Sequence, residues 1–296
     1  MSIETYKFSN QDFNLEETLT CGQTFCWNRT QGKLYNSSED EQESSDTFYT
    51  FKNGEPIIAK TEDKEVIVKT TNLSRETIEQ ALGLQHDLEK IFESFPHDEN
   101  LEKSKEELWG LRIIQDDFFP CLISYLLSPQ MRIPRIKKMW NEIAEKYGET
   151  IEFEGHGLQR FPTLEELSVA TENELRELGT GYRAKYIAET VKILNEEEFS
   201  EENLRRVSYP EAKEKVLELY GVGDKVADCV LLFSLNHLEA YPIDTWAEKA
   251  IKKHYSSLHT EDYEELSEKM REYFGPYSGY AQEYLFHASR QDIIEV

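Results

Sequence analysis

The sequence predicts an α+β fold, with an N-terminal antiparallel β lobe followed by an all-helical body. Two patterns support this. Short apolar runs separated by turn residues fill the chain from about residue 8 to residue 69, and after Arg75 the apolar residues recur with the period of helices. Strands followed by helices are typical of the α+β class. The 296 residues are enough for two domains, which we expect at 1–105 and 106–296.

The β lobe is predicted from five runs in which apolar and polar residues alternate, as in strands that bury one face. These runs are FCWNR, KLYN, TFYTFKNG, PIIAK and EVIVKTT. The acidic, serine-rich stretch 36–46 interrupts them, and its composition predicts a solvated hairpin loop. Helices at TIEQALG and LEKIFESF complete the expected first domain.

The body is predicted as a set of helices joined by short loops, because apolar residues recur there at three- and four-residue intervals. The helical segments are FFPCLISYLLS, IPRIKKMWNEIAEKYG, TLEELSVATENELREL, AKYIAETVKILN, YPEAKEKVLELYG, KVADCVLLFSL, DTWAEKAIKKHY, YEELSEKMREYFG and GYAQEYLFHASRQ.

The chain is strongly acidic, with 33 basic and 58 acidic residues and a formal net charge of −25. Nonspecific affinity for nucleic acids comes from neutralising phosphates, so this charge by itself argues against such a partner. A salt-rich cytoplasm would produce the same composition, because charges are screened over short distances there. Particular site residues must therefore decide the question.

Targeting and metal signals are absent from the sequence. No apolar run approaches the roughly 20 residues that cross a bilayer, and the start MSIETYKFSN lacks the order of a signal peptide. We therefore expect a cytoplasmic protein without a membrane partner. The four cysteines at 21, 26, 121 and 229 form neither a Cys-x-x-Cys pair nor a Cys/His quartet, so no metal site is expected.

Two motifs place reactive groups at helix starts. Two helical patterns meet across Gly221, Val222 and Gly223, a sharp turn that needs glycine backbone angles and leaves N–H groups for a phosphate. Lys225 follows in the first turn of the second helix, where the helix dipole disfavours a cation, which suggests a functional role. Asp244 in YPID occupies an N-cap position. A purely structural αα-hairpin and a simple cap are the alternatives.

Together these motifs resemble the helix-hairpin-helix, Gly/Pro…Asp superfamily of DNA base-excision glycosylases, and more closely its 8-oxoguanine DNA glycosylases. Four further segments extend the resemblance over most of the chain, namely FNLEETLTCGQTFCW, LLSPQMRIPRI, LGTGYRAKY and GYAQEYLFHASRQ. The resemblance implies that Lys225 is the nucleophile and that Asp244 is the catalytic carboxylate. The cysteine quartet of the iron–sulfur branch is missing, so no cofactor is expected.

The resemblance also implies a base pocket. The carbonyl of Gly22 would accept a hydrogen bond from the N7–H of the oxidised base, and Gln282 would read its Watson–Crick edge. Cys229 and Phe286 would sandwich the base. The spacing agrees, because Cys229 lies four residues after Lys225 and Phe286 four residues after Gln282, so each pair shares one helix face. Without the resemblance, Cys229 and Phe286 are equally well read as core residues.

A third set of residues would contact the duplex around the extruded base. By the resemblance, Gln130 fills the gap and Tyr182 wedges beside it, while Arg183 and Arg135 contact the orphan cytosine. The hairpin Gly221, Val222 and Gly223 would hold the DNA backbone.

Three positions depart from the animal members, which carry Arg, Asn and His where Cys26, Gln130 and Trp246 stand here. A tryptophan in place of histidine removes a phosphate-side donor, so the lesion or opposite-base preference could differ.

The implied function is a bifunctional glycosylase and AP lyase that excises 8-oxoguanine from damaged double-stranded DNA. Such an enzyme works as a monomer, without an obligatory protein partner, on the nucleoid of a prokaryotic cytoplasm. Two alternatives stay open. One is a glycosylase/lyase for an alkylated or ring-opened purine, and the other is a non-enzymatic helix-hairpin-helix DNA-binding protein.

Overall fold

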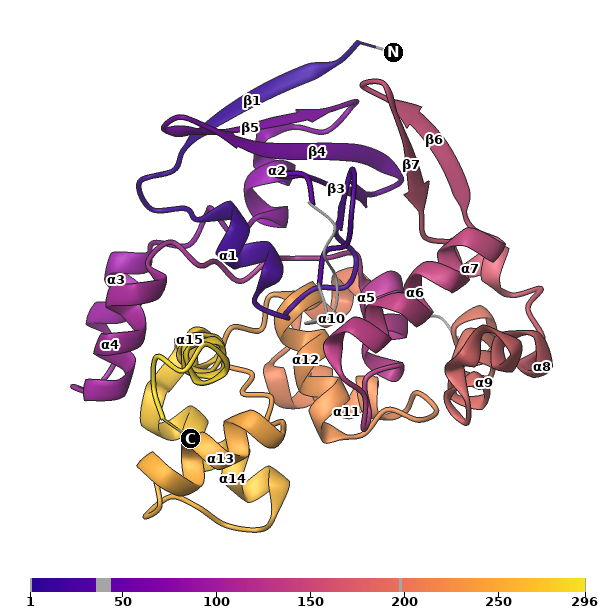
Figure 1. Cartoon of the computed structure of the whole chain (residues 1–296). Helices are drawn as coiled ribbons and strands as arrows, with labels where there is room; N and C mark the ends of the chain where they lie inside the picture. Colours follow the sequence, from indigo (N-terminus) through magenta and orange to yellow (C-terminus); the bar gives the residue numbers. More distant parts are fainter. Residues whose placement is uncertain (1, 36–43, 197–198, 296) are drawn as a thin grey trace.

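A computed structural model of the chain confirms the α+β class, with an antiparallel sheet followed by a mostly helical body (Figure 1). The structure describes residues 2–35, 44–196 and 199–295. Most of the predicted acidic loop at 36–46 lies outside these residues.

The N-terminal sheet has five antiparallel strands in the order β1-β5-β4-β3-β2. The strands are β1 Glu4–Ser9, β2 Asn28–Arg29, β3 Thr47–Lys52, β4 Glu55–Glu62 and β5 Glu65–Thr70. Asn53 and Gly54, both with positive φ, form the tight turn between β3 and β4. One strand prediction was wrong, because the described part of KLYN is not a strand, and strand β1 was not predicted.

Four helices accompany this sheet: α1 Leu15–Thr20, α2 Arg75–Ala81, α3 Leu88–Glu93 and α4 Glu99–Leu108. Each begins at an Asn, Ser or Asp whose side chain accepts a hydrogen bond from the first turn. Helices α1 and α4 were not predicted, because α1 is short and α4 is polar on most of its surface.

The body contains the remaining elements. They are α5 Phe118–Leu126, α6 Ile133–Tyr147, β6 Glu149–Phe153, β7 His156–Arg160, α7 Leu164–Leu167, α8 Glu172–Leu175, the π-helical turn Arg176–Thr180, α9 Arg183–Glu196, α10 Glu201–Arg206, α11 Tyr209–Leu217, α12 Asp224–Leu235, α13 Thr245–His254, α14 Tyr263–Phe274, the 3-10 turn Gly275–Tyr277 and α15 Ser278–Arg290.

The body is not all-helical as predicted, because β6 and β7 form a hairpin. This hairpin buries Phe153 and Leu158 against Tyr49 and Ile58 of the N-terminal sheet, a contact with residues distant in sequence. The segment TLEELSVATENELREL is also not one helix. Thr163 and a second threonine eight residues later each start a new helix with a capping box, so α7 and α8 are separate.

Helix α12 lies at the centre of the body, and every residue from 226 to 235 is buried. It packs on α5, while α15 packs on both α4 and α13. The main hydrophobic cluster contains residues from both sides of position 105, such as Leu101 and Leu111. The division at 105/106 stays a prediction.

Candidate active site and DNA interface

The hairpin between α11 and α12 depends on one glycine. Gly221 has a φ of +85°, and a Cβ there would come within 2.4 Å of the Tyr186 ring. Gly223, the N-cap of α12, has a φ of −105° and open space around it. The N–H of Val222 donates to the carbonyl of Leu219 at 3.1 Å, so this amide is not free for a phosphate.

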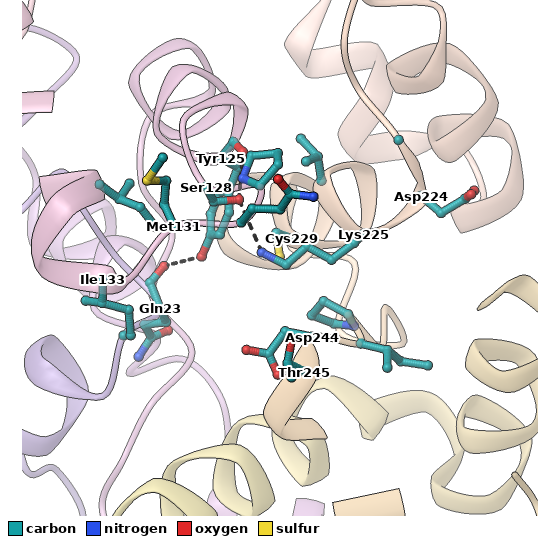
Figure 2. A pocket seen from close by; sticks show the side chains of 18 of the residues that line it. Gln23, Tyr125, Ser128, Met131, Ile133, Asp224, Lys225, Cys229, Asp244 and Thr245 are labelled. Atoms are coloured by element: carbon teal, nitrogen blue, oxygen red, sulfur yellow. Dashed lines mark hydrogen bonds between the residues drawn. The ribbon is translucent and has the colours of Figure 1, made fainter. Parts of the chain in front are cut away.

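Lys225 is the second residue of α12, and its half-buried side chain enters a cavity (Figure 2). Its Nζ donates to Ser128 Oγ at 3.4 Å and lies 5.1 Å from the centroid of the Tyr125 ring. Tyr125 is itself fixed, because its hydroxyl donates to the carbonyl of Gln23 at 2.6 Å. The amine therefore rests against an aromatic face and a hydroxyl.

Asp244 is the N-cap of α13, as predicted. Its Oδ1 accepts hydrogen bonds from the N–H groups of Trp246 and Ala247 at 2.9 and 2.8 Å. Lys225 and Asp244 line the same cavity, which has a volume of about 860 Å³ (Figure 2). The structure therefore brings a primary amine and a carboxylate fixed by helix N–H groups to one space.

The four predicted base-pocket residues line this cavity too. Burial raises the pKa of the Cys229 thiol to about 12, although the nearby Lys225 acts in the opposite direction. The thiol therefore stays protonated and forms an uncharged part of the cavity lining. Gln282 is buried, and within the described part of the chain its Oε1 has no hydrogen-bond partner. A buried amide oxygen without a partner is an available acceptor for a ligand.

The side chains of Ile133 and Arg290 lie close to the backbone at Gly22. Its φ is +115°, and a Cβ there would lie 2.8 Å from Ile133 Cδ1 and 2.9 Å from Arg290 Nη1. Any larger residue would be strained and would displace its neighbours.

Of the predicted DNA contacts, Gln130, Tyr182, Gly221 and Gly223 line the cavity, and three others do not: Arg135, Arg183 and Val222. Arg183 is only 2% exposed, and its guanidinium donates to the carbonyl of Pro129 next to Gln130. Arg135 donates to the carbonyl of Gly179 at 3.1 Å. As they lie, both arginines hold loops together, and their contact with an orphan cytosine stays a prediction.

Several cavity residues were missed by sequence reasoning. Ser128 and Tyr125 contact Lys225. Tyr125 belongs to a segment predicted only as an apolar helix, and Ser128 lies in LLSPQMRIPRI, from which the resemblance selected only Gln130 and Arg135. Glu283 is 2% exposed, and burial raises its pKa. Tyr263 comes from α14, accepts the N–H of Ile243 at 3.1 Å and donates to Asp228 at 2.8 Å. Glu283 follows Gln282 directly and Ser128 lies two residues before Gln130, so their places beside predicted site residues were the usable sequence signals.

No metal cluster is found in the ranges that the structure describes, where no three His, Cys, Asp or Glu side chains are grouped suitably. All four cysteines are free and buried. Among the described helices, none has the length and apolar character needed to cross a membrane.

Two known sequence families match consecutive stretches of the chain. Residues 5–122 match the family "8-oxoguanine DNA glycosylase, N-terminal domain". Residues 123–276 match "HhH-GPD superfamily base excision DNA repair protein". The chain belongs to the HhH-GPD superfamily, in its 8-oxoguanine DNA glycosylase branch.

Relatives of this HhH-GPD protein cover most of its length. It is 34% identical over 245 residues to a "Probable N-glycosylase/DNA lyase" of Methanothermobacter thermautotrophicus, covering 75% of this chain and 77% of the relative. It is 28% identical over 293 residues to the "N-glycosylase/DNA lyase OGG1" of Arabidopsis thaliana, covering 95% and 79%. The structure of a Clostridium acetobutylicum 8-oxoguanine glycosylase/lyase with double-stranded DNA superposes with a TM-score of 0.83 at 31% identity, covering 99% of both chains.

The positions that depart from the animal members lie in different places in this HhH-GPD protein. Cys26 is buried and lines a second cavity of about 280 Å³, away from Lys225. Gln130 lines the main cavity with a positive φ of 58°. Trp246 is 39% exposed in the first turn of α13, directly after the cavity residues Asp244 and Thr245.

Proposed function

We propose that this protein is a bifunctional DNA glycosylase and AP lyase that excises 8-oxoguanine from duplex DNA. The observation that carries the proposal is the shared cavity, which holds Lys225 and Asp244. The relatives support it, since they include proteins named N-glycosylase/DNA lyase and a glycosylase/lyase bound to DNA with cytosine opposite 8-oxoguanine. Double-stranded DNA is the proposed partner, and a single chain holds the complete set of cavity residues.

The base would enter the cavity after it is flipped out of the duplex. The Gly22 carbonyl would accept the N7–H that distinguishes 8-oxoguanine from guanine, and Gln282 would pair with the Watson–Crick edge. Cys229 as a neutral thiol and Phe286 would contact the two faces of the ring.

The chemistry uses the amine as nucleophile. The lone pair of Lys225 Nζ forms a bond to C1′, and the bond from C1′ to the base nitrogen breaks, with its electrons leaving on the base. The sugar has cationic character during this step, which the carboxylate of Asp244 would stabilise. The nitrogen then loses a proton, the C1′–O4′ bond breaks and O4′ takes up a proton, which leaves a Schiff base between Lys225 and C1′. Loss of a C2′ proton then expels the 3′ phosphate and cleaves the strand.

Borohydride trapping tests this proposal. Reduction of the Schiff base should link the protein to a duplex that carries 8-oxoguanine opposite cytosine, and Lys225→Gln should abolish the linked product. Lys138→Gln is the matched control, because Lys138 is an exposed lysine of α6. Normal trapping by Lys225→Gln would reject the assignment.

A panel of lesion duplexes separates the alternatives. Release of an alkylated or ring-opened purine in preference to 8-oxoguanine would favour a glycosylase for another base. Binding of DNA without release of any modified base would favour a non-enzymatic binding protein.

A further inference from the structure

Exposed hydrophobic side chains gather around the mouth of the cavity. Seven large hydrophobic residues are exposed in the described ranges; two of them line the cavity, and two more are next to lining residues in the chain. Met131 and Tyr182, 37% and 45% exposed, line the cavity directly. Tyr220, 40% exposed, precedes Gly221 of the hairpin, and Trp246, 39% exposed, follows the cavity residue Thr245. Such a grouping of exposed apolar residues marks an interaction surface.

Next to two of these aromatic rings lies a lysine ammonium group that forms no ion pair with a carboxylate in the described residues. Lys185 Nζ lies 5.3 Å from the centroid of Tyr220, and Lys249 Nζ lies 4.9 Å from that of Trp246. Neither lysine has a carboxylate partner in the part of the chain that the structure describes. Most other lysines of this acidic protein do form ion pairs, as Lys252 does with Glu248 at 2.8 Å.

The cavity itself offers no surplus of positive charge. The cations among its lining residues are Arg132 and Lys225, whereas the acidic residues are Asp224, Asp244, Glu248 and Glu283. A polyanion held at this mouth therefore needs contacts outside the cavity. The two lysine–aromatic pairs lie on α9 with the hairpin and on α13, and Figure 1 shows α9 and α13 on opposite sides of α12.

We propose that the pairs Tyr220–Lys185 and Trp246–Lys249 grip duplex DNA on the two sides of the extruded nucleotide. Each ring packs against a flanking sugar or base, and the lysine beside it contacts the adjacent phosphate. This inference rests on the proposed function, and it explains how a chain with a net charge of −25 holds DNA through a few local cations.

Equilibrium binding at several salt concentrations tests the inference. Fluorescence anisotropy would measure Kd for a labelled duplex that carries a reduced abasic site, which mimics the extruded nucleotide and cannot be cleaved. Tyr220→Ala and Trp246→Ala should each weaken binding roughly 5- to 150-fold, the loss typical of a base–aromatic stacking contact. Lys185→Gln and Lys249→Gln should each lower the slope of log Kd against log salt by about 1.

Matched controls come from residues away from the cavity. Val169→Ala removes an exposed apolar residue, and Lys146→Gln removes a lysine that lies 5.1 Å from the Tyr147 ring, so both should leave Kd and the slope unchanged. Wild-type affinity in both aromatic variants would overturn the inference, as would unchanged salt slopes in both lysine variants. Borohydride trapping of the wild-type chain tests the glycosylase/lyase activity independently of these variants. Successful trapping together with unchanged binding in the variants would therefore reject the proposed DNA contacts and leave the proposed function intact.

Discussion

At the residue scale, Asp244 combines two roles that substitution can separate. Its Oδ1 caps α13, and its carboxylate charge faces the cavity beside Lys225. Asparagine caps a helix as well as aspartate does, but it carries no charge. We therefore expect Asp244→Asn to keep the stability of the fold within about 1 kcal/mol and to slow base release by about 10²- to 10³-fold. Single-turnover excision and denaturant unfolding would measure the two effects.

Asp244→Ala provides the comparison, since alanine loses both the cap and the charge. Its base release should be slowed as much as in Asp244→Asn, and its free energy of unfolding should in addition fall by about 1 kcal/mol. Turnover at the wild-type rate in Asp244→Asn would show that Asp244 is only a cap.

Residue-level prediction from sequence succeeded where local spacing decides the outcome. The four-residue intervals between Lys225 and Cys229, and between Gln282 and Phe286, put all four residues on the lining of one cavity. Arg183 shows the limit. The sequence places it after a turn, but its burial depends on Pro129, which is 54 residues away in the chain. No local pattern encodes such a contact.

At the element scale, the two hairpin glycines make a matched pair. Alanine at Gly221 would have to adopt a φ of +85° and would meet the Tyr186 ring at 2.4 Å. Positive φ and overpacking together should cost about 2–5 kcal/mol. Gly223→Ala introduces no clash and should cost about 1 kcal/mol or less, the effect of a poorer N-cap. Urea unfolding would compare them, and equal losses would contradict this assignment.

The strands that sequence reasoning missed have a common cause. The β6–β7 hairpin owes its stability to Phe153 and Leu158 packing on Tyr49 and Ile58, which belong to another sheet. Strand β1 likewise forms only by pairing with β5. Helices with a clear apolar period and capping signals, such as α6 and α13, were predicted close to their observed bounds. Tertiary pairing therefore explains the missed strands, the short or polar helices α1, α4 and α10 lacked a clear apolar period, and local periodicity explains the successes.

At the scale of the whole molecule, a buried lysine joins the β lobe to the body and makes the stability of the fold depend on pH. Lys137 of α6 is 5% exposed, donates to the carbonyl of Phe25 at 2.6 Å and lies 4.1 Å from the Trp140 ring. Burial lowers its pKa to about 7, while the neighbouring Cys26 and Asp116 act in the opposite direction. Asp116 is itself buried, which raises its pKa to about 6.

The pKa of Lys137 gives the sign of a stability change between pH 7 and 8.5. The unfolded lysine, with its ordinary pKa of 10.5, stays protonated over this range, whereas the folded one loses its proton above about 7. The unfolded state therefore binds more protons, so stability rises with pH by up to about 1.4 kcal/mol per pH unit. Asp116 contributes no slope here, because its effect is complete once pH exceeds about 6. In Lys137→Met this rise should be missing, so the free energy of unfolding of the wild type minus that of the variant should increase from pH 7 to 8.5, as measured by urea denaturation. The four buried thiols, whose pKa values burial raises, ionise first in the unfolded state and lower the stability of both proteins equally as pH approaches about 8.5, so they cancel in this difference. A difference that does not change with pH would show that Lys137 is not the titrating group.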